Sequence, residues 1–589
     1  MNLSRSQGWS SVTRVGPIAL ILLLTWLVYG EAYQWDYFQY DDEDLIKNNP
    51  VLAGGLNLAS ISYAFVQVQP FAMPMVWLSY LLDVSLTGTH SAAVYHVSNV
   101  LYHMVNTLLV YQLVGLLGQS QRVAWLTAAL FALHPQHVEA VAWIMERKEL
   151  VAFLFGILAV LAYVRWLKAE KSPGWRWLAV ACYLLSLLAK PQWITLPFLL
   201  LLLDGWPLGR TREGWQRLVG EKWPFFALTV IFSLITTFYF SNRNMLVGLE
   251  EITLESRLLA ALHGVIQQLA KTFWPQDLAV IYPSIGHLLN WQELVGGTAI
   301  LLGVSGLVWW GYRRGYPWWA VGWLWYLGSL FPTLGLVNGG TIVGMADRWN
   351  YLPHVLFFLA LARGSEGLLT HPLWKKGVMA GVGVVVAAMT LVSQQQAHLW
   401  RSSESLWIST LEASQPWPNP HVHWLLGNHY LDTQRRVQAL PHLLLAYQQA
   451  PAESLFVESL LVYFLQEGQH EQALVLLESL LNNPRTTPEQ LMSVGESLLT
   501  AGLAQQAVTV FTLALRQPPR FYTPAFANAM LSFSRALFLN GEKNTAFQAL
   551  GFYLNGMNRL EEHCQQARQR VKEETLGAEV VRWCEGKGR

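Results

Sequence analysis

Apolar residues fill the chain in long runs up to about residue 395, and beyond it they recur at helical spacing among polar residues. About eleven runs are long enough to cross the roughly 30 Å core of a bilayer as helices. They lie near residues 17–33, 94–117, 123–139, 149–167, 177–190, 192–206, 223–240, 292–311, 316–334, 351–366 and 377–394. The pattern predicts an all-α chain, with a polytopic membrane domain at residues 1–395 and a helical domain at residues 396–589.

Basic residues gather in alternate loops between the expected spans. These loops hold Arg122; Lys168, Lys171 and Arg176; Arg210, Arg212, Arg217 and Lys222; Arg313 and Arg314; and Lys375 and Lys376. Because cytoplasmic loops retain Lys and Arg, the N-terminus is predicted to be cytoplasmic. An odd number of spans then places residues 396–589 outside, in the periplasm or a lumen. Two further amphipathic stretches, Asn57–Leu82 and Ser256–Trp274, are predicted to lie on the membrane surface.

Composition agrees with this division of the chain. Hydrophobic residues make up 53% of the chain and charged residues only 13%, and many of the 28 tryptophans stand at the ends of apolar runs. A net charge of +1 with no basic face gives no reason to expect a nucleic-acid partner. Membrane lipids are the expected surroundings. Cys564 and Cys584 can bridge only if their side of the membrane is oxidising, and Cys182 is expected to pack inertly within a span.

The C-terminal domain repeats itself with a period of 34 residues. Gly468-Gln-His-Glu-Gln-Ala473 recurs as Gly502-Leu-Ala-Gln-Gln-Ala507, and Ala439 stands 34 residues before Ala473. A fourth copy at Gly541 follows a spacing of 39, which indicates an insertion near Pro518–Thr523. Glycine in the turn between two helices, alanine early in the second helix and a closing proline are typical of tetratricopeptide repeats. An α-solenoid of three or four repeats offers a groove for a peptide; a hairpin array that only packs is the alternative.

An acidic cluster, Asp41-Asp42-Glu43-Asp44, opens the first outside loop. Carboxylates held this close to a membrane are costly and suggest a function. One of the pair Asp41 and Asp42 can act as a base, or both can hold a divalent metal. A solvated acidic loop is the other interpretation of these residues, and the acids alone do not decide.

A second polar constellation runs from His134 through Glu139 to Arg147 and Lys148. The spacing of the histidines and Glu139 matches no firm zinc motif, so a polar network is expected. Arg147 and Lys148 would stand at the outer surface, either to hold a phosphate or to anchor lipid headgroups.

Two more basic residues are expected on the outer side. Lys190 precedes Pro191 at a helix end, where it either binds an anion or snorkels to the interface. Arg348 follows the glycine-rich stretch 338–347 and can clamp a phosphate or pair with Asp347. Asp204 falls on the inner side and is expected to be structural.

Five stretches together resemble the transmembrane and tetratricopeptide repeat (TMTC) family of O-mannosyltransferases, within the GT-C superfamily. They are Tyr40-Asp41-Asp42 with Asn49-Pro50; His134-Pro135 through Glu139 to Trp143 and Arg147; Lys190-Pro191 with Leu203-Asp204-Gly205-Trp206-Pro207-Leu208; Pro275 to Tyr282-Pro283; and Ala346-Asp347-Arg348 with Tyr351-Leu352-Pro353. The repeat array here is shorter than is usual in that family, which bears on the acceptor, and Asp347 stands where Glu is as frequent.

The resemblance implies a GT-C-like membrane domain that uses a polyprenyl- or dolichyl-phosphate-linked sugar on the outer face. It assigns the catalytic base to Asp41 or Asp42. It assigns the lipid phosphate to Arg348, Arg147, Lys148 and Lys190, with His134 and Glu139 in the same substrate region. No cofactor is implied beyond the divalent metal that Asp41 and Asp42 would hold in the alternative.

The resulting hypothesis is an inverting transfer of a hexose such as mannose to a protein Ser or Thr hydroxyl, with the repeats presenting the acceptor. Two alternatives are a non-enzymatic scaffold that recruits a partner through its repeats, and transfer to a glycan or lipid. A scaffold has no need for acids and a basic cluster at one membrane face, so the predicted orientation favours the enzyme.

Overall fold

The computed structural model describes residues 11–66, 73–242, 252–283, 291–336, 345–371, 373–516, 524–555, 560–571 and 574–585. Every regular element in these ranges is a helix, which confirms the predicted all-α class. The chain divides into two compact units, Met1–Pro418 and Asn419–Arg589. The boundary expected near residue 395 falls inside a helix of the first unit, α17 (Lys375–Leu399).

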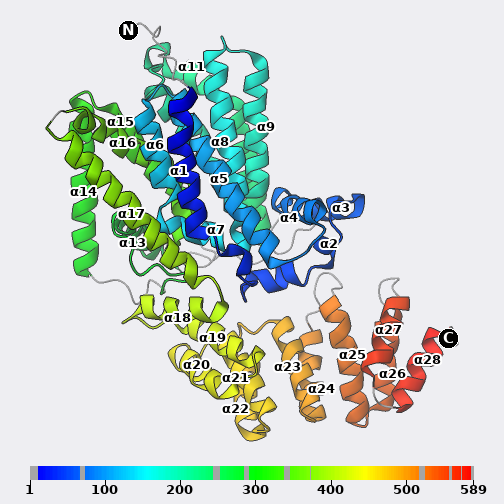
Figure 1. Cartoon of the computed structure of the whole chain (residues 1–589). Coiled ribbons are helices and arrows are strands. Elements are labelled where there is room, and N and C mark those ends of the chain that lie inside the picture. Colours follow the sequence, from blue (N-terminus) through cyan, green and yellow to red (C-terminus); the bar gives the residue numbers. More distant parts are fainter. Residues whose placement is uncertain are drawn as a thin grey trace. The chain divides into compact units, whose positions relative to one another are not determined.

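The first unit is a bundle of long helices joined by short ones (Figure 1). Its elements are α1 (Ser11–Tyr29), η1 (Ala32–Gln34), η2 (Glu43–Lys47), α2 (Pro50–Ala53), α3 (Leu58–Val66), α4 (Pro74–Thr87), α5 (Ala92–Leu116), α6 (Gln121–Ala132), η3 (Pro135–His137), α7 (Val138–Ala142), η4 (Ile144–Glu146), α8 (Arg147–Lys168), α9 (Pro173–Ala189), η5 (Pro191–Thr195), α10 (Leu196–Gly205), η6 (Thr211–Glu213), α11 (Trp215–Gly220), α12 (Trp223–Asn242), α13 (Leu254–Phe273), α14 (Trp291–Arg313), α15 (Pro317–Leu330), η8 (Phe331–Thr333), η9 (Asp347–Asn350), α16 (His354–Thr370), α17 and α18 (Ser403–Ser414).

Each of the apolar runs recognised in the sequence contains a helix. Five helices in the described ranges are long and apolar enough to cross a membrane: Gly16–Gln34, Ile144–Lys168, Trp223–Ser241, Leu294–Arg313 and Lys375–Leu399. Several others are shorter than a bilayer crossing requires, because the chain breaks them with proline. Thus α6 ends at Ala132 ahead of His134-Pro135, and α9 ends at Ala189 ahead of Lys190-Pro191.

The two amphipathic stretches are also helical. The first is divided between α3 and α4, and residues 67–72 between them lie outside the described ranges. The second is α13, whose buried side carries Gln268, which donates to the carbonyl oxygen of Ala346 at 2.7 Å. This contact joins α13 to the segment that leads into η9.

At one end of the bundle, near α11, a buried ionic network holds the helices together (Figure 1). Asp204 is fully buried on α10 and pairs with Lys222, which precedes α12, and with Arg210 at 3.0 Å. The hydroxyl of Tyr163 on α8 donates to Asp204 at 2.8 Å. This geometry agrees with the structural role expected of Asp204.

Asp204→Asn is expected to destabilise the bundle strongly. Removing one partner of a buried ion pair leaves an uncompensated charge, here on Lys222, and costs about 3–5 kcal/mol. Thermal unfolding in detergent micelles measures the effect as a lowered melting temperature. Glu213→Gln is the control, because Glu213 pairs with Arg210 at the half-exposed rim of the same network and should cost less than about 1 kcal/mol. Equal melting temperatures for Asp204→Asn and Glu213→Gln would contradict the structural role of Asp204.

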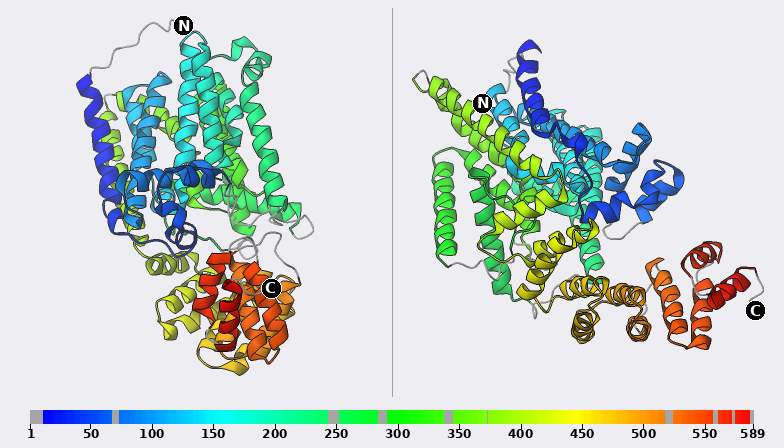
Figure 2. Two further views of the ribbon diagram at one scale, coloured as in Figure 1. Left: turned by 90° about the vertical axis from the view of Figure 1, so that its right-hand side faces the viewer. Right: turned by 60° about the horizontal axis from the view of Figure 1, so that its bottom comes forward.

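The described residues of the second unit form a stack of five helical hairpins (Figure 2). They pair α19 (Pro420–Asp432) with α20 (Arg436–Gln449), α21 (Ser454–Gln466) with α22 (His470–Leu481), α23 (Pro488–Thr500) with α24 (Ala504–Leu515), α25 (Pro524–Leu539) with α26 (Lys543–Asn555), and α27 (Leu560–Arg570) with α28 (Glu574–Cys584). The expected insertion near Pro518–Thr523 lies at residues outside the described ranges.

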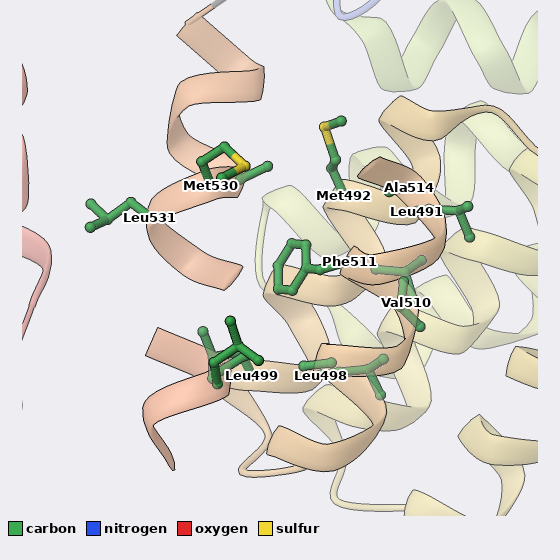
Figure 3. Close-up of a cluster of buried hydrophobic side chains, with 14 of the residues drawn as sticks. Leu491, Met492, Leu498, Leu499, Val510, Phe511, Ala514, Met530 and Leu531 are labelled. Carbon is green, nitrogen blue, oxygen red and sulfur yellow. The ribbon is translucent and has the colours of Figure 1, made fainter. Parts of the chain in front are cut away.

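The repeat signature has a direct physical basis. Gly468, Gly502 and Gly541 lie in the turns inside three hairpins with φ of +70°, +81° and +89°, a region that favours glycine. Ala439, Ala473, Ala507 and Ala546 are buried where the second helix of each hairpin meets the first. Figure 3 shows part of the resulting core, including the ring of Phe511 on α24. This ring packs against Gly495 on α23, where an added Cβ atom would lie only 2.8 Å from it.

The fifth hairpin carries no copy of the signature and was not predicted. Cys564 on α27 and Cys584 on α28 form a disulfide across it. Cys182 is a buried free cysteine on α9, as expected. Structural disulfides are typical of oxidising compartments.

Candidate active site

The acidic loop and the basic residues meet at the end of the bundle opposite α11, where α7 lies (Figure 1). Between α6 and α8 the chain forms three short helices, η3, α7 and η4, in place of one long helix. Helix α7 packs against η9, and α17 packs against both η3 and α7. Residues as far as 209 positions apart in the sequence, Glu139 and Arg348, are thereby brought into one polar cluster.

Asp41 and Asp42 occupy different environments although they are neighbours. The Asp42 carboxylate is fully buried and accepts hydrogen bonds from the backbone N–H groups of Met145 at 2.9 Å and Phe38 at 3.3 Å. Asp41 is only half-buried. Asp42 therefore anchors the acidic loop to η4, and Asp41 is the more accessible carboxylate of the pair.

Aromatic side chains hold the same loop from the other side. The ring of Phe38 lies 4.7 Å from Trp407 on α18 and 5.9 Å from Trp143, measured between ring centroids. The backbone N–H of Gln39 donates to the Ser403 hydroxyl at 2.9 Å. Helix α18, which no sequence motif singled out, is thus part of the support for the acidic loop.

Arg348 is the central cation of the cluster. Its guanidinium pairs with Glu139 and, through Nε, with Glu146 at 3.1 Å, and its backbone N–H donates to Glu139 at 2.8 Å. It also lies over the Trp143 ring, 5.5 Å from the centroid. The ring of Tyr40, directly before Asp41, is 6.0 Å from the same indole, so Trp143 contacts both the acidic loop and Arg348.

Two lysines complete the basic side of the cluster. Lys148 Nζ lies 2.9 Å from a carboxylate oxygen of Glu146, and Lys190 Nζ lies 2.5 Å from Glu149 and 3.5 Å from Glu146. Both lysine side chains retain 14–18% exposure, as does Arg348 at 17%. Three partly accessible cations therefore surround one buried carboxylate.

Arg147 and His134 lie elsewhere. Arg147 is fully buried and donates to Asp83 at 2.5 Å, to Asn99 at 2.7 Å and to the Tyr95 carbonyl at 2.8 Å. His134 is fully buried and lies 3.0 Å from the Thr272 carbonyl of α13. Both side chains use their polar atoms to fix neighbouring helices, so the basic cluster consists of Arg348, Lys148 and Lys190.

Asp41 and Asp42 are the carboxylates that the alternative hypothesis assigns to a divalent metal. Both oxygens of Asp42 accept hydrogen bonds from backbone N–H groups, those of Met145 and Phe38. Within the described ranges, no group of three or more His, Cys, Asp and Glu side chains is arranged to hold a metal ion. The glycine-rich stretch before Arg348 lies mostly at residues 337–344, outside the described ranges.

Comparisons with known proteins show what this chain is similar to in sequence. No family model matches the chain. Mouse protein O-mannosyl-transferase TMTC1 is 31% identical over 159 residues, which cover 26% of this chain and 17% of the mouse protein. Human protein O-mannosyl-transferase TMTC4 is 24% identical over 499 residues, which cover 73% of this chain and 65% of the human protein.

The chain is TMTC-like. A Drosophila protein O-mannosyl-transferase, Tmtc2, adds a match of 35% identity over 127 residues, which cover 21% of this chain and 14% of the fly protein. The TMTC-like chain spans about a fifth of the length of the first curated relatives that it matches, 17% and 19%. The match to TMTC4 is the one that covers most of this chain among these three comparisons.

The buried carboxyl groups give the TMTC-like site a characteristic pH dependence. Burial raises the pKa of Asp42 to about 8 and outweighs the opposing effect of its backbone hydrogen bonds. Burial also raises the pKa of Asp347 to about 6, against the lowering effect of Lys271 and of the hydrogen bond from Tyr282. The folded protein therefore keeps protons that the unfolded chain loses near pH 4, at about the usual carboxyl pKa.

The free energy of unfolding is accordingly expected to fall as pH rises from about 5 to about 8. In this pH range the folded state binds more protons than the unfolded state. Asp42→Asn should flatten this slope, since an amide does not titrate. Melting temperatures in detergent at several pH values measure the slope for the wild type, for Asp42→Asn and for Asp36→Asn, an exposed residue of the same loop. If Asp42→Asn retained the wild-type slope, the buried carboxyl of Asp42 would not be its source.

Proposed function

We propose that this chain is an inverting membrane glycosyltransferase that moves a hexose, mannose by its relatives' names, from a polyprenyl- or dolichyl-phosphate to a protein Ser or Thr hydroxyl. The observation that carries the proposal is that one indole, Trp143, contacts both Tyr40, which directly precedes the half-buried Asp41, and Arg348. Arg348 in turn shares Glu146 with the partly exposed Lys148 and Lys190. The curated relatives are named protein O-mannosyl-transferases, which supports the same class of reaction.

In the proposed reaction, the acceptor hydroxyl attacks the anomeric carbon as Asp41 takes its proton. The bond between the anomeric carbon and the phosphate oxygen breaks, and the electron pair leaves with the lipid phosphate. Inversion follows from this single displacement. Asp42 does not receive the proton in this scheme; it holds the loop so that Asp41 faces the sugar.

The three cations stabilise the negative charge that develops on the departing phosphate. Groups that are already in place when charge develops are usually the largest contribution to such catalysis. Arg348 is fixed by Glu139 and by its stacking on Trp143, so it is held in position before substrate arrives. Lys148 and Lys190 approach the same point from η4–α8 and from the α9–η5 junction.

The membrane orientation is part of the proposal. With the N-terminus in the cytoplasm, the end of the bundle that holds the acidic loop faces the periplasm or lumen, where the donor sugar would be used. The disulfide between Cys564 and Cys584 supports the same location for the repeats. Their groove would present the protein acceptor, a use common to such arrays.

A scaffold without enzymatic activity is the competing proposal. Its support would be the repeat array, which by itself only requires a protein partner. The ionic cluster argues against it, because burying Glu139, Glu146 and Glu149 with three cations stabilises a fold less well than apolar packing of the same volume. Retaining charges at such a position is better explained by a charged ligand.

Transfer by the purified full-length chain tests the proposal. The protein in nanodiscs is incubated with dolichyl-phosphate mannose and a library of Ser/Thr peptides, and the products are analysed by mass spectrometry. We expect a hexose on Ser or Thr that base-catalysed elimination removes. Transfer to a glycan or lipid instead would change the acceptor class, and no transfer to any acceptor would favour the scaffold.

A further inference from the structure

Glu146 is the least satisfied carboxylate in the cationic cluster. One of its oxygens lies 2.9 Å from Lys148 Nζ and 3.1 Å from Arg348 Nε. The other lies 3.5 Å from Lys190 Nζ and accepts no hydrogen bond from the described part of the chain, although the side chain is only 1% exposed. Three cations therefore share a group with two oxygens.

The neighbouring carboxylates are held much more firmly. Both oxygens of Glu139 are engaged by Arg348, one by the guanidinium and one by the backbone N–H. Glu149 is engaged by Lys190 at 2.5 Å. With the Gln192 amide turned so that its nitrogen faces Glu149, that nitrogen lies 2.9 Å and 2.8 Å from the two carboxylate oxygens. Only Glu146 has contacts with all three cations and a buried oxygen with no donor.

We propose that Glu146 is a placeholder for the donor phosphate: it holds Arg348, Lys148 and Lys190 together in the empty site and competes with the phosphate for them. A phosphate offers more acceptor oxygens than a carboxylate, so each cation can gain its own partner. This inference rests on the proposed function and adds to it a positioning residue that acts through the cations.

Charge explains why a placeholder would be useful. Without ligand, the carboxylates Glu139, Glu146 and Glu149 balance the three cations. A lipid-phosphate sugar is a phosphodiester with one negative charge, and the lipid phosphate left after transfer carries up to two. The product is thus bound more tightly than the donor unless a competing anion displaces it. Glu146 supplies that anion and accelerates product release, a step that limits many enzymes.

Glu146→Gln should bind lipid phosphate more tightly and turn over more slowly, two effects that mere damage to the site would not combine. Geranylgeranyl monophosphate is titrated into the full-length protein in zwitterionic nanodiscs, and inorganic phosphate is titrated separately. We expect the Kd of geranylgeranyl monophosphate to fall about tenfold for Glu146→Gln, which is equivalent to the free energy of one weak ion pair. For the same variant we expect a lower kcat and stronger inhibition by the lipid-phosphate product. Tightening for both phosphates assigns the site to phosphate in general, and tightening for the lipid phosphate alone assigns it to the carrier.

Two variants make the comparison specific. Glu221→Gln removes another carboxylate that three cations surround, Lys171, Arg210 and Arg217, at the other end of the bundle, and should leave the Kd unchanged. Glu146→Asp keeps the negative charge, so its Kd for geranylgeranyl monophosphate should equal that of the wild type. This variant still tests the role of the charge if Glu146→Gln does not fold. A Kd that is unchanged or higher in folded Glu146→Gln overturns the placeholder. If the wild type itself does not bind geranylgeranyl monophosphate, the proposed phosphate site fails instead.

Discussion

Asp41→Asn is expected to reduce sugar transfer by about 100-fold or more, the usual contribution of a positioned general base. The amide cannot accept the proton of the acceptor hydroxyl, while its size and the hydrogen-bonded frame around Asp42 are unchanged. Binding of the donor should change little, because the phosphate is held by the cations and not by Asp41. The loss should therefore appear in kcat and not in the KM for the lipid-phosphate sugar.

Asp36→Asn is the matched control for this experiment. Asp36 lies in the same loop, is exposed and accepts a hydrogen bond from the neighbouring backbone N–H of Tyr37 at 2.7 Å. It should retain wild-type transfer. Wild-type kcat for Asp41→Asn in a folded protein would remove the base from the proposed mechanism and return the acidic loop to a structural role.

Arg348→Gln is expected to reduce the rate of sugar transfer by about 100- to 1,000-fold. The loss of one preorganised electrostatic group has an effect of this size in other enzymes. It removes the only cation that contacts both Glu139 and Glu146 among the described residues. Arg348→Lys should not restore activity, because a lysine cannot span two carboxylates and stack on Trp143 in the same geometry. Steady-state kinetics with the lipid-phosphate sugar measure both variants, and geranylgeranyl monophosphate binding should weaken in parallel.

Arg363→Gln is the control for Arg348. Arg363 lies on α16, farther along the same segment of chain, and pairs with Glu366 one turn away. Its loss should leave transfer unchanged. Equal activity of Arg348→Gln and Arg363→Gln would show that the cluster does not hold the phosphate.

The sequence predicted the helices of this protein better than the tertiary contacts between them. Long apolar runs and the 34-residue period depend on neighbours along the chain, so the helices of both units follow from local pattern. The apolar run 177–190 ends within one residue of α9, whereas the run 123–139 continued past Pro135 although α6 already ends at Ala132. The fifth hairpin lacked the glycine and alanine signature and was therefore missed.

The site was only partly predictable for a related reason. Arg147 and Lys148 are adjacent, and no rule of sequence distinguishes the one that turns inward to Asp83 from the one that reaches Glu146. The same holds for Asp41 and Asp42, which burial separates. Trp407 and Ser403 support the acidic loop from about 365 residues away, a contact that only the tertiary fold reveals.

A structure of the full-length protein with a bound lipid-phosphate sugar tests the central claim most directly. We expect the phosphate within hydrogen-bond distance of Arg348, Lys148 and Lys190, and the anomeric carbon on the side of Asp41. A phosphate bound elsewhere in the bundle, with Arg348 still paired to Glu139 and Glu146 and Asp41 facing solvent, would contradict it.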